Sequence, residues 1–384
     1  MKTKQYQTAL ELLNAQPEPP LVKVARCFYM MDQTQKALQT LIFFFSQPGH
    51  TKEELFEAYV LQAEGNDELD MTQEAIDSYE NALQLDPKHA ESHLEKGMLL
   101  SQLGRVEEAL VCFETVIGLD PTNAKALFCK ANCLDDMGNT EEALTYIDIS
   151  LEIDEEQPSA WYNKGTMLMA LGLHEDAIHC FERVIQLGSN NALVKSTPRQ
   201  VGNSLNNIGS ILAETGQIEL ALEHFDRAIQ VSELVISSVL INKGTTLMGI
   251  HEVEAALNCF LQAVEFEESE APDLNQHVKG GVTFKDEQDF VTALKNVAVT
   301  YQALGKHMEA IYYFNKLLLI NDHDIQSRET GTSEIEVEDN PLMKSAEFIA
   351  CLQALIPIQD TTEPIFSGIN LLLEMRPVAA SMWC

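Results

Sequence analysis

The sequence has few basic residues. Lysine and arginine together number 25, against 59 aspartates and glutamates, and the formal net charge is −34. Contacts to nucleic-acid phosphates need clustered lysine and arginine side chains, so this balance argues against an unassisted nucleic-acid-binding protein. It equally disfavours attraction to an anionic membrane surface. We therefore expect no nucleic-acid partner.

Long hydrophobic runs are also missing. The most apolar short run, residues 41–45, is far too short to cross a bilayer. The two early lysines are not followed by a continuous apolar segment, as they would be in a signal peptide. The eight cysteines are scattered through helical patterns, which favours reduced thiols in a cytoplasm-like compartment. The sequence thus predicts a cytoplasmic chain with no membrane insertion.

Motifs for catalysis or metal binding are not found either. His174 and His179 of the stretch HEDAIH are five residues apart, so they project from different helix faces and do not form a zinc motif. Cys129 and Cys133 could share a face, but no second pair at a suitable spacing completes a site. Residues 279–281, KGG, lack the phosphate-loop spacing, and no nucleophile–base arrangement occurs. We expect a non-enzymatic protein without cofactor or metal.

What the sequence does have is internal repetition. Successive spacings between the alanines of EEAL-like stretches are 38, 34, 34, 34, 44, 35 and 54 residues. These alanines are Ala37, Ala75, Ala109, Ala143, Ala177, Ala221, Ala256 and Ala310. Twelve residues before each stands a small residue: Ala25, Ala63, Gly97, Ala131, Gly165, Gly209, Gly244 and Ala298. Four residues after each stands a large apolar one: Leu41, Tyr79, Phe113, Ile147, Phe181, Phe225, Phe260 and Phe314.

This pattern resembles the tetratricopeptide repeat, a unit of about 34 residues that consists of two antiparallel helices. The resemblance covers about residues 18–322 and is fullest in residues 90–123. It implies an all-α, right-handed superhelical solenoid of about eight helix pairs, stabilised by stacking of neighbouring units. A glycine inside a helix costs about 1 kcal/mol relative to alanine. We expect Gly165 to stand there because the two helices of its unit approach each other closely near Ala177.

The period also predicts the divisions of the chain. Residues 1–17 hold an N-terminal helix near residues 4–15, and the array occupies residues 18–322, with polar insertions near 190–201 and 270–290. Residues 323–340 are an acidic linker, and residues 341–384 form a C-terminal helical pair. Asn340 and Pro341 suit the N-cap and first position of its opening helix. The apolar side chains of this pair either cap the last repeat or bind another chain.

Acidic residues recur at the start of the expected second helices. The helix macrodipole favours negative charge there, so these acids indicate a solvated structural face rather than a site for a basic ligand. They are Glu107, Glu108, Glu141, Glu142, Glu175 and Asp176.

Asparagine recurs two residues before the small residue of the first helix. It does so at Asn163, Asn207, Asn242 and Asn296. The resemblance implies that this position faces a concave groove, where a row of asparagines can hold an extended peptide. A carboxamide suits that task because it offers both donors and an acceptor to a peptide backbone. Further candidates on the same face are Tyr162, Thr166, Asn203, Asn206, Ser210, Thr245 and Lys295.

The resemblance raises a second binding mode, the lysine–asparagine–arginine clamp for the C-terminal carboxylate of chaperones. Phe128 and Asn207 stand where the clamp needs cations, so a carboxylate would lack charge-assisted donors. We therefore expect a scaffold or adaptor that binds an extended segment of a protein partner in its groove. Two alternatives stay open: self-association into a homo-oligomer or complex through the C-terminal helices, and service as the regulatory subunit of an enzyme.

Overall fold

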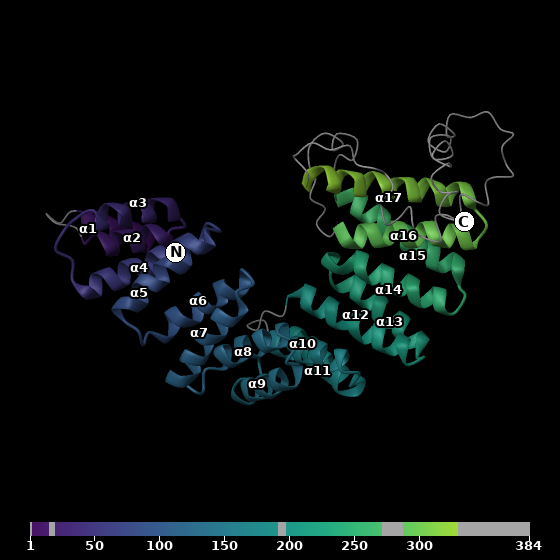
Figure 1. Ribbon diagram of the computed structural model, residues 1–384, viewed down its shortest axis with the longest axis horizontal. Helices are drawn as coiled ribbons and strands as arrows, with labels where there is room; N and C mark the ends of the chain where they lie inside the picture. Colours follow the sequence, from purple (N-terminus) through teal and green to yellow (C-terminus); the bar gives the residue numbers. More distant parts are fainter. Residues whose placement is uncertain (1, 15–19, 191–196, 271–286, 329–384) are drawn as a thin grey trace, which may run out of the picture. The chain divides into compact units, whose positions relative to one another are not determined.

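All regular secondary structure in the described residues is helical. The computed structural model describes residues 2–14, 20–190, 197–270 and 287–328. These ranges contain seventeen α-helices and one short 3-10 helix, and no strand is found within them (Figure 1). None of the described helices is both long and apolar enough to span a bilayer. The chain divides into two compact units, residues 1–200 and residues 201–384. The all-α expectation is confirmed.

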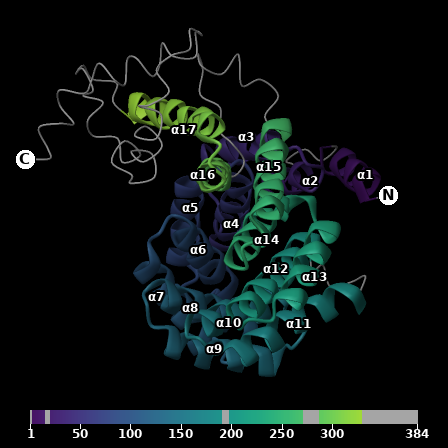
Figure 2. The ribbon, with the colours of Figure 1, turned by 90° about the vertical axis from the view of Figure 1, so that its right-hand side faces the viewer.

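The first unit is a succession of helix pairs that follows a single short helix. Its helices are α1 (Lys2–Asn14), α2 (Leu21–Tyr29), α3 (Thr34–Phe45), α4 (Lys52–Glu68), α5 (Thr72–Leu85), α6 (Ala90–Gln102), α7 (Val106–Leu119), α8 (Ala124–Asp136), α9 (Thr140–Ile153), α10 (Pro158–Ala170) and α11 (His174–Asn190). From α2 onward each even-numbered helix packs on the next odd-numbered one, and each pair packs on the following pair (Figure 2). The N-terminal helix that the sequence predicts is α1.

The second unit repeats this arrangement in its described part. Its helices are α12 (Pro198–Glu214), α13 (Ile218–Val231), the 3-10 helix η1 (Glu233–Val235), α14 (Ile236–Gly249), α15 (Val253–Glu270), α16 (Glu287–Ala303) and α17 (His307–Arg328). Helix α14 pairs with α15 and α16 with α17, and α14 also contacts α16. Helix α12 packs against α13, and at this contact Gly209 of α12 lies directly against the Phe225 ring of α13.

In each helix pair, the turn between the two helices contains a residue in the left-handed backbone region. In the turn between α6 and α7 this residue is Gly104, with φ +72°, and the Arg105 amide donates to the Leu100 carbonyl, at 2.9 Å. This geometry satisfies carbonyls at the end of the helix. Glycine adopts it without steric penalty. In the α14–α15 turn His251 takes this place, with φ +64°.

The repeat positions found in the sequence form the core. All eight alanines of the second helices are at most 1% exposed. All eight small residues of the first helices are buried. The large apolar residues are at most 5% exposed. The period therefore identified the residues along which the two helices of a pair meet.

The glycines are required by the aromatic ring of their own repeat. A Cβ built on Gly97, Gly165 or Gly209 would lie 2.7 Å from a Cε1 of Phe113, Phe181 or Phe225. Real Cβ atoms essentially never approach a carbon atom that closely. The expectation that Gly165 marks a close helix approach is confirmed, and its partner is the Phe181 ring.

Several predicted boundaries differ from those of the structure. The polar insertion near 190–201 is narrower than expected, because α11 continues to Asn190 and α12 starts at Pro198, which suits the first turn of a helix. Helix α17 runs on to Arg328, past the predicted end of the array at residue 322, and no proline or glycine interrupts it. The helical pair expected in residues 341–384 lies outside the described residues.

Candidate functional site

The four recurring asparagines lie on the first helices of their pairs. Asn163 is on α10 in the first unit, and Asn207, Asn242 and Asn296 are on α12, α14 and α16 in the second. All four are half-buried. The acids of the second helices occupy the first turns of α7, α9 and α11, as predicted.

Asn163 is joined to the neighbouring pair. Its Nδ2 donates to Oδ1 of Asn132 on α8, at 2.8 Å. Helices α8 and α10 are the first helices of successive pairs, and they are in contact. One amide proton of Asn163 is thereby used within the protein, while its Oδ1 and second amide proton are left for other partners. This bridge is not visible in the sequence, because Asn132 and Asn163 hold different positions within their repeats.

The second unit contains a similar bridge. Asn242 Nδ2 on α14 donates to Oδ1 of Asn206 on α12, at 3.1 Å. Asn206 is only 9% exposed. The sequence analysis placed Asn206 among the surface candidates. The structure instead places Asn206 between α12 and α14, where its Oδ1 accepts the hydrogen bond from Asn242.

Four asparagines, Asn163, Asn207, Asn242 and Asn296, form what we call the asparagine row, and two of them form no such bridge in the part of the chain that the structure describes. Among the described residues, the side chains of Asn207 and Asn296 have no hydrogen-bond partner. Both are half-buried, as is Asn203 one turn before Asn207. Lys295, next to Asn296, is exposed. Among the described residues, the carboxamides of Asn207 and Asn296 therefore keep their full set of donors and acceptors.

The hydroxyl candidates are bonded within their own helices. Thr166 donates to the Asn163 carbonyl at 2.8 Å, and Thr245 donates to the Ile241 carbonyl at 2.8 Å. Ser210 donates to the Asn206 carbonyl at 3.1 Å. Each proton is used, so these groups can only accept a hydrogen bond from a ligand.

Tyr162 packs on Phe181, with ring centroids 5.8 Å apart. It is half-buried and extends the apolar surface beside Asn163.

A row of lysine–carboxylate pairs joins successive repeats. The lysine stands one residue before the small residue of a first helix, and the carboxylate lies on the second helix of the preceding pair. The pairs are Lys96–Glu80 at 2.7 Å, Lys130–Glu114 at 2.9 Å, Lys164–Asp148 at 2.6 Å and Lys243–Asp226 at 2.5 Å. The sequence analysis missed them. The signal was the recurrence of lysine before Gly97, Ala131, Gly165 and Gly244.

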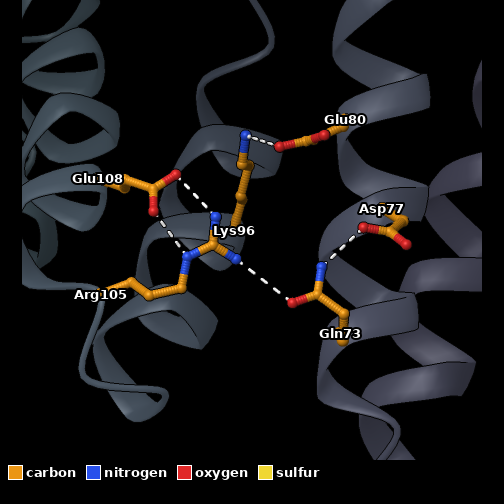
Figure 3. A network of polar contacts seen from close by, with 6 residues as sticks. All are labelled: Gln73, Asp77, Glu80, Lys96, Arg105 and Glu108. Carbon is orange, nitrogen blue, oxygen red and sulfur yellow. Dashed lines mark hydrogen bonds and ion pairs between the residues drawn. The ribbon is translucent and has the colours of Figure 1, made fainter.

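Figure 3 shows one such junction, between the pair α4–α5 and the pair α6–α7. Lys96 reaches Glu80, and Arg105 binds Glu108 through two hydrogen bonds of 2.7 Å each. Arg105 also donates to Oε1 of Gln73, at 3.3 Å. The hydrogen bonds from Arg105 lower the pKa of the Glu108 carboxyl. Because the carboxylates of Glu80 and Glu108 are exposed, we expect these ion pairs to contribute little to stability.

The first unit has an acidic surface near Glu95. Of the positions equivalent to Asn163 on its earlier first helices, which are Lys23, Leu61, Glu95 and Cys129, only Glu95 is acidic. The equivalent of Asn163 on α6 is Glu95, which pairs with Lys125 at 3.0 Å. Burial raises the pKa of Glu64 on α4, and the charges of Glu91 and Glu95 raise it further, against the opposing effect of Arg26. The asparagine row and this acidic surface are therefore different environments.

Of the six cysteines in the described residues, five are buried and Cys129 is half-buried. Burial raises the pKa of Cys129 and of Cys180 to about 11, and it also raises that of Cys112 and Cys259. A thiolate is the reactive form of cysteine, so thiols with pKa values this high stay protonated at neutral pH. Within the described residues no group of three metal-ligating side chains comes together.

Three family models match the sequence. Two are described as tetratricopeptide repeat, over residues 156–233 and 68–117, and the third as anaphase-promoting complex, cyclosome, subunit 3, over residues 104–184. The matched residues contain the glycine–phenylalanine contacts of Gly97, Gly165 and Gly209. The chain contains tetratricopeptide repeats.

Solved structures resemble this tetratricopeptide repeat protein. A tetratricopeptide repeat protein from Parabacteroides merdae matches with a TM-score of 0.51 at 17% identity, over 71% of this chain and 97% of that one, and it supports the fold. PilW, described as a type IV pilus biogenesis factor, has a TM-score of 0.46 at 21% identity, over 59% of this chain and 96% of that one. No curated protein matches the sequence. Tetratricopeptide arrays are protein–protein interaction scaffolds, and this chain carries one.

Proposed function

We propose that this protein is a non-enzymatic adaptor that binds an extended segment of a protein partner along its first helices, through Asn207, Asn242 and Asn296 in the second unit. Asn163 is the corresponding candidate in the first unit. The observation that carries the proposal is the state of Asn207 and Asn296. Their side chains are half-buried and have no partner among the described residues. A polar group in such a place gains from a ligand that completes its hydrogen bonds.

The chemistry favours a peptide backbone as the ligand. One carboxamide can donate to a peptide C=O and accept from a peptide N–H, so successive asparagines can follow an extended chain without reading its side chains. Each such hydrogen bond contributes about 0.5–1.5 kcal/mol net. Three or four of them give modest affinity, and neighbouring groups such as Tyr162, Asn203 and Lys295 then discriminate between sequences.

The two internal bridges support the proposal by fixing orientation. Asn163 and Asn242 each donate one amide proton to another asparagine, Asn132 and Asn206. Such a bond determines which way each carboxamide faces, so a ligand does not have to order it. We infer that these two residues present their oxygens to the peptide, while Asn207 and Asn296 adapt to it.

The test is a comparative affinity capture from native lysate, read by mass spectrometry. The first variant carries Asn207→Ala, Asn242→Ala and Asn296→Ala, and the second carries Asn163→Ala alone. The matched control is Asn258→Ala, an exposed asparagine on the second helix α15. Circular dichroism must show equal helicity in all of them.

We expect partners that the control retains to be lost from the triple variant, and some of them from Asn163→Ala. Retention of every partner by the triple variant would exclude the asparagine row as the binding site. A purified chain that turned over a substrate would overturn the non-enzymatic part of the proposal. We also propose a cytoplasmic location, which fractionation of cells that express the tagged chain would test.

Self-association is the second candidate. It is favoured by the apolar side chains of Ile365, Phe366, Ile369 and Leu372, which need a surface to cover them. These residues lie outside the described part of the chain. A concentration-dependent mass in light scattering that disappears when the chain ends at Asp339 would support this candidate.

A further inference from the structure

Three tyrosines form a partly exposed surface on the last described helix pair. Tyr301 on α16 stacks on Tyr313 of α17, with ring centroids 5.7 Å apart and 22° between the planes. Tyr312 packs edge-on against Tyr313, at 5.1 Å, and is 54% exposed. Aromatic rings exposed in this way provide apolar area at low cost in side-chain entropy. None of these three tyrosines belongs to the proposed peptide site.

Two lysines lie beside these rings in a strongly acidic chain. Lys316 Nζ lies 5.1 Å from the Tyr312 ring and 5.7 Å from the Tyr313 ring, and Lys306 Nζ lies 5.8 Å from the Tyr301 ring. Lys316 also binds Glu268 at 2.7 Å, with both side chains about one third exposed. Lys306 has no carboxylate partner among the described residues. We call Tyr301, Lys306, Tyr312, Tyr313 and Lys316 the tyrosine–lysine surface.

We propose that residues 333–340 of the same chain, SEIEVEDN, dock on the tyrosine–lysine surface. Charge complementarity is the first argument. This segment has four carboxylates, at Glu334, Glu336, Glu338 and Asp339, and no basic residue. Glu334, Glu336 and Glu338 alternate with Ile335 and Val337, so an extended segment has an apolar side for the tyrosine rings, with Asp339 at its end. Its carboxylates then lie within reach of the flexible lysine side chains at the edges of the surface.

The length of the connection is the second argument. Helix α17 ends at Arg328, and a helix rises about 1.5 Å per residue, so Lys316 lies about 18 Å back along it and Lys306 about 33 Å back. An extended chain spans at most about 3.3 Å per residue, so Glu334 lies within about 20 Å of Arg328 and Asp339 within about 36 Å. A segment that runs antiparallel to α17 thus brings Glu334 to Lys316 and Asp339 to Lys306. The short tether also gives the docked segment a high effective concentration.

The experiment is zero-length carbodiimide cross-linking of the full-length protein, which joins a lysine amine to a carboxylate in direct contact. An equal mixture of unlabelled and nitrogen-15-labelled chains distinguishes links within one chain from links between two. The Lys316–Glu268 and Lys96–Glu80 pairs serve as positive controls. Lys295, exposed on α16 but outside the tyrosine–lysine surface, serves as the negative control.

We expect links within single chains from Lys306 or Lys316 to residues 334–339, with a yield that falls as added salt screens the charges. Links found only in mixed-isotope pairs would overturn the proposal in favour of a second copy on this surface. The complete lack of links to residues 334–339, with both positive controls formed, would overturn it outright.

A second measurement does not depend on lysine chemistry. The variant Glu334→Gln, Glu336→Gln, Glu338→Gln and Asp339→Asn removes the charges without adding bulk. Its matched control is Glu329→Gln with Glu347→Gln, which lie on either side of the segment. Nitration of Tyr312 by tetranitromethane should become faster in the variant and not in the control. Equal rates in the wild-type chain and the variant would contradict docking.

Discussion

Gly165 lies directly against the ring of Phe181, and a Cβ built on Gly165 would stand 2.7 Å from Cε1 of that ring. The two residues belong to α10 and α11, the helices of one pair. The same contact recurs between Gly97 and Phe113 and between Gly244 and Phe260. The contact between the glycine and the aromatic ring determines the distance between the two helices of a pair.

We therefore predict that Gly165→Ala destabilises the first unit. Overpacking a well-filled core costs about 1–3 kcal/mol, which exceeds the gain of about 1 kcal/mol in helix propensity. The control is Gly118→Ala on α7, where a Cβ meets no atom within 4 Å, so only the propensity gain remains. Urea denaturation followed by circular dichroism should show opposite shifts of the midpoint. Equal shifts in the two variants would contradict the close contact.

The double variant Gly165→Ala with Phe181→Ile should recover part of the loss. The pair α8–α9 already combines Ala131 with Ile147, both fully buried. The smaller side chain makes room for the added methyl group, so the two changes should be less harmful together than their sum.

Lys130 should contribute more to stability than the other lysines that link repeats. Its side chain is only 10% exposed, it binds Glu114 at 2.9 Å, and its Nζ lies 4.3 Å from the Tyr146 ring centroid. Desolvated cation–ring contacts contribute about 2 kcal/mol, whereas an exposed ion pair contributes about 0.2–1 kcal/mol. A double-mutant cycle on Lys130 and Glu114, compared with one on Lys96 and Glu80, measures the difference. Similar costs for Lys130→Ala and Lys96→Ala would refute this prediction.

Alanine substitutions of two asparagines should affect the stability of the fold and the binding of a partner differently. Asn163→Ala removes the hydrogen bond to Asn132 and leaves that amide without its partner, so it should lower stability by about 0.5–1.5 kcal/mol. Asn207→Ala removes a side chain with no described partner, so it should leave the thermal midpoint unchanged and weaken only partner capture. A clear loss of stability in Asn207→Ala would mean that this residue has a structural role.

The buried thiols should make the fold sensitive to alkaline pH. The pKa of Cys180 is about 11 in the folded chain, raised by burial from a reference value of 9.0. A raised pKa favours the protonated folded form, so this contribution is complete below about pH 9 and is lost as the pH rises towards 11. The urea midpoint should therefore fall between pH 9 and 11, and less steeply in Cys180→Ala. Parallel pH profiles in the two proteins would exclude this cause.

The sequence by itself determined the repeat and its core. A period of about 34 residues, with alanine, a small residue and a large apolar residue at constant offsets, is a local signal that recurs often enough to be certain. It located the buried positions of every pair and the reason for Gly165, because packing between two helices of one unit depends on residues close in sequence. It also placed the acids at the first turns of α7, α9 and α11.

Only the tertiary structure decided which polar groups are already engaged. Asn132 and Asn163 form a hydrogen bond although they hold different repeat positions, and Asn206 is buried by α14 although it resembles a surface residue in sequence. The lysine–carboxylate links and the tyrosine–lysine surface likewise join different helices. Each of these contacts depends on how helices from separate segments rotate against one another, and side-chain directions at that level are set by packing rather than by the period.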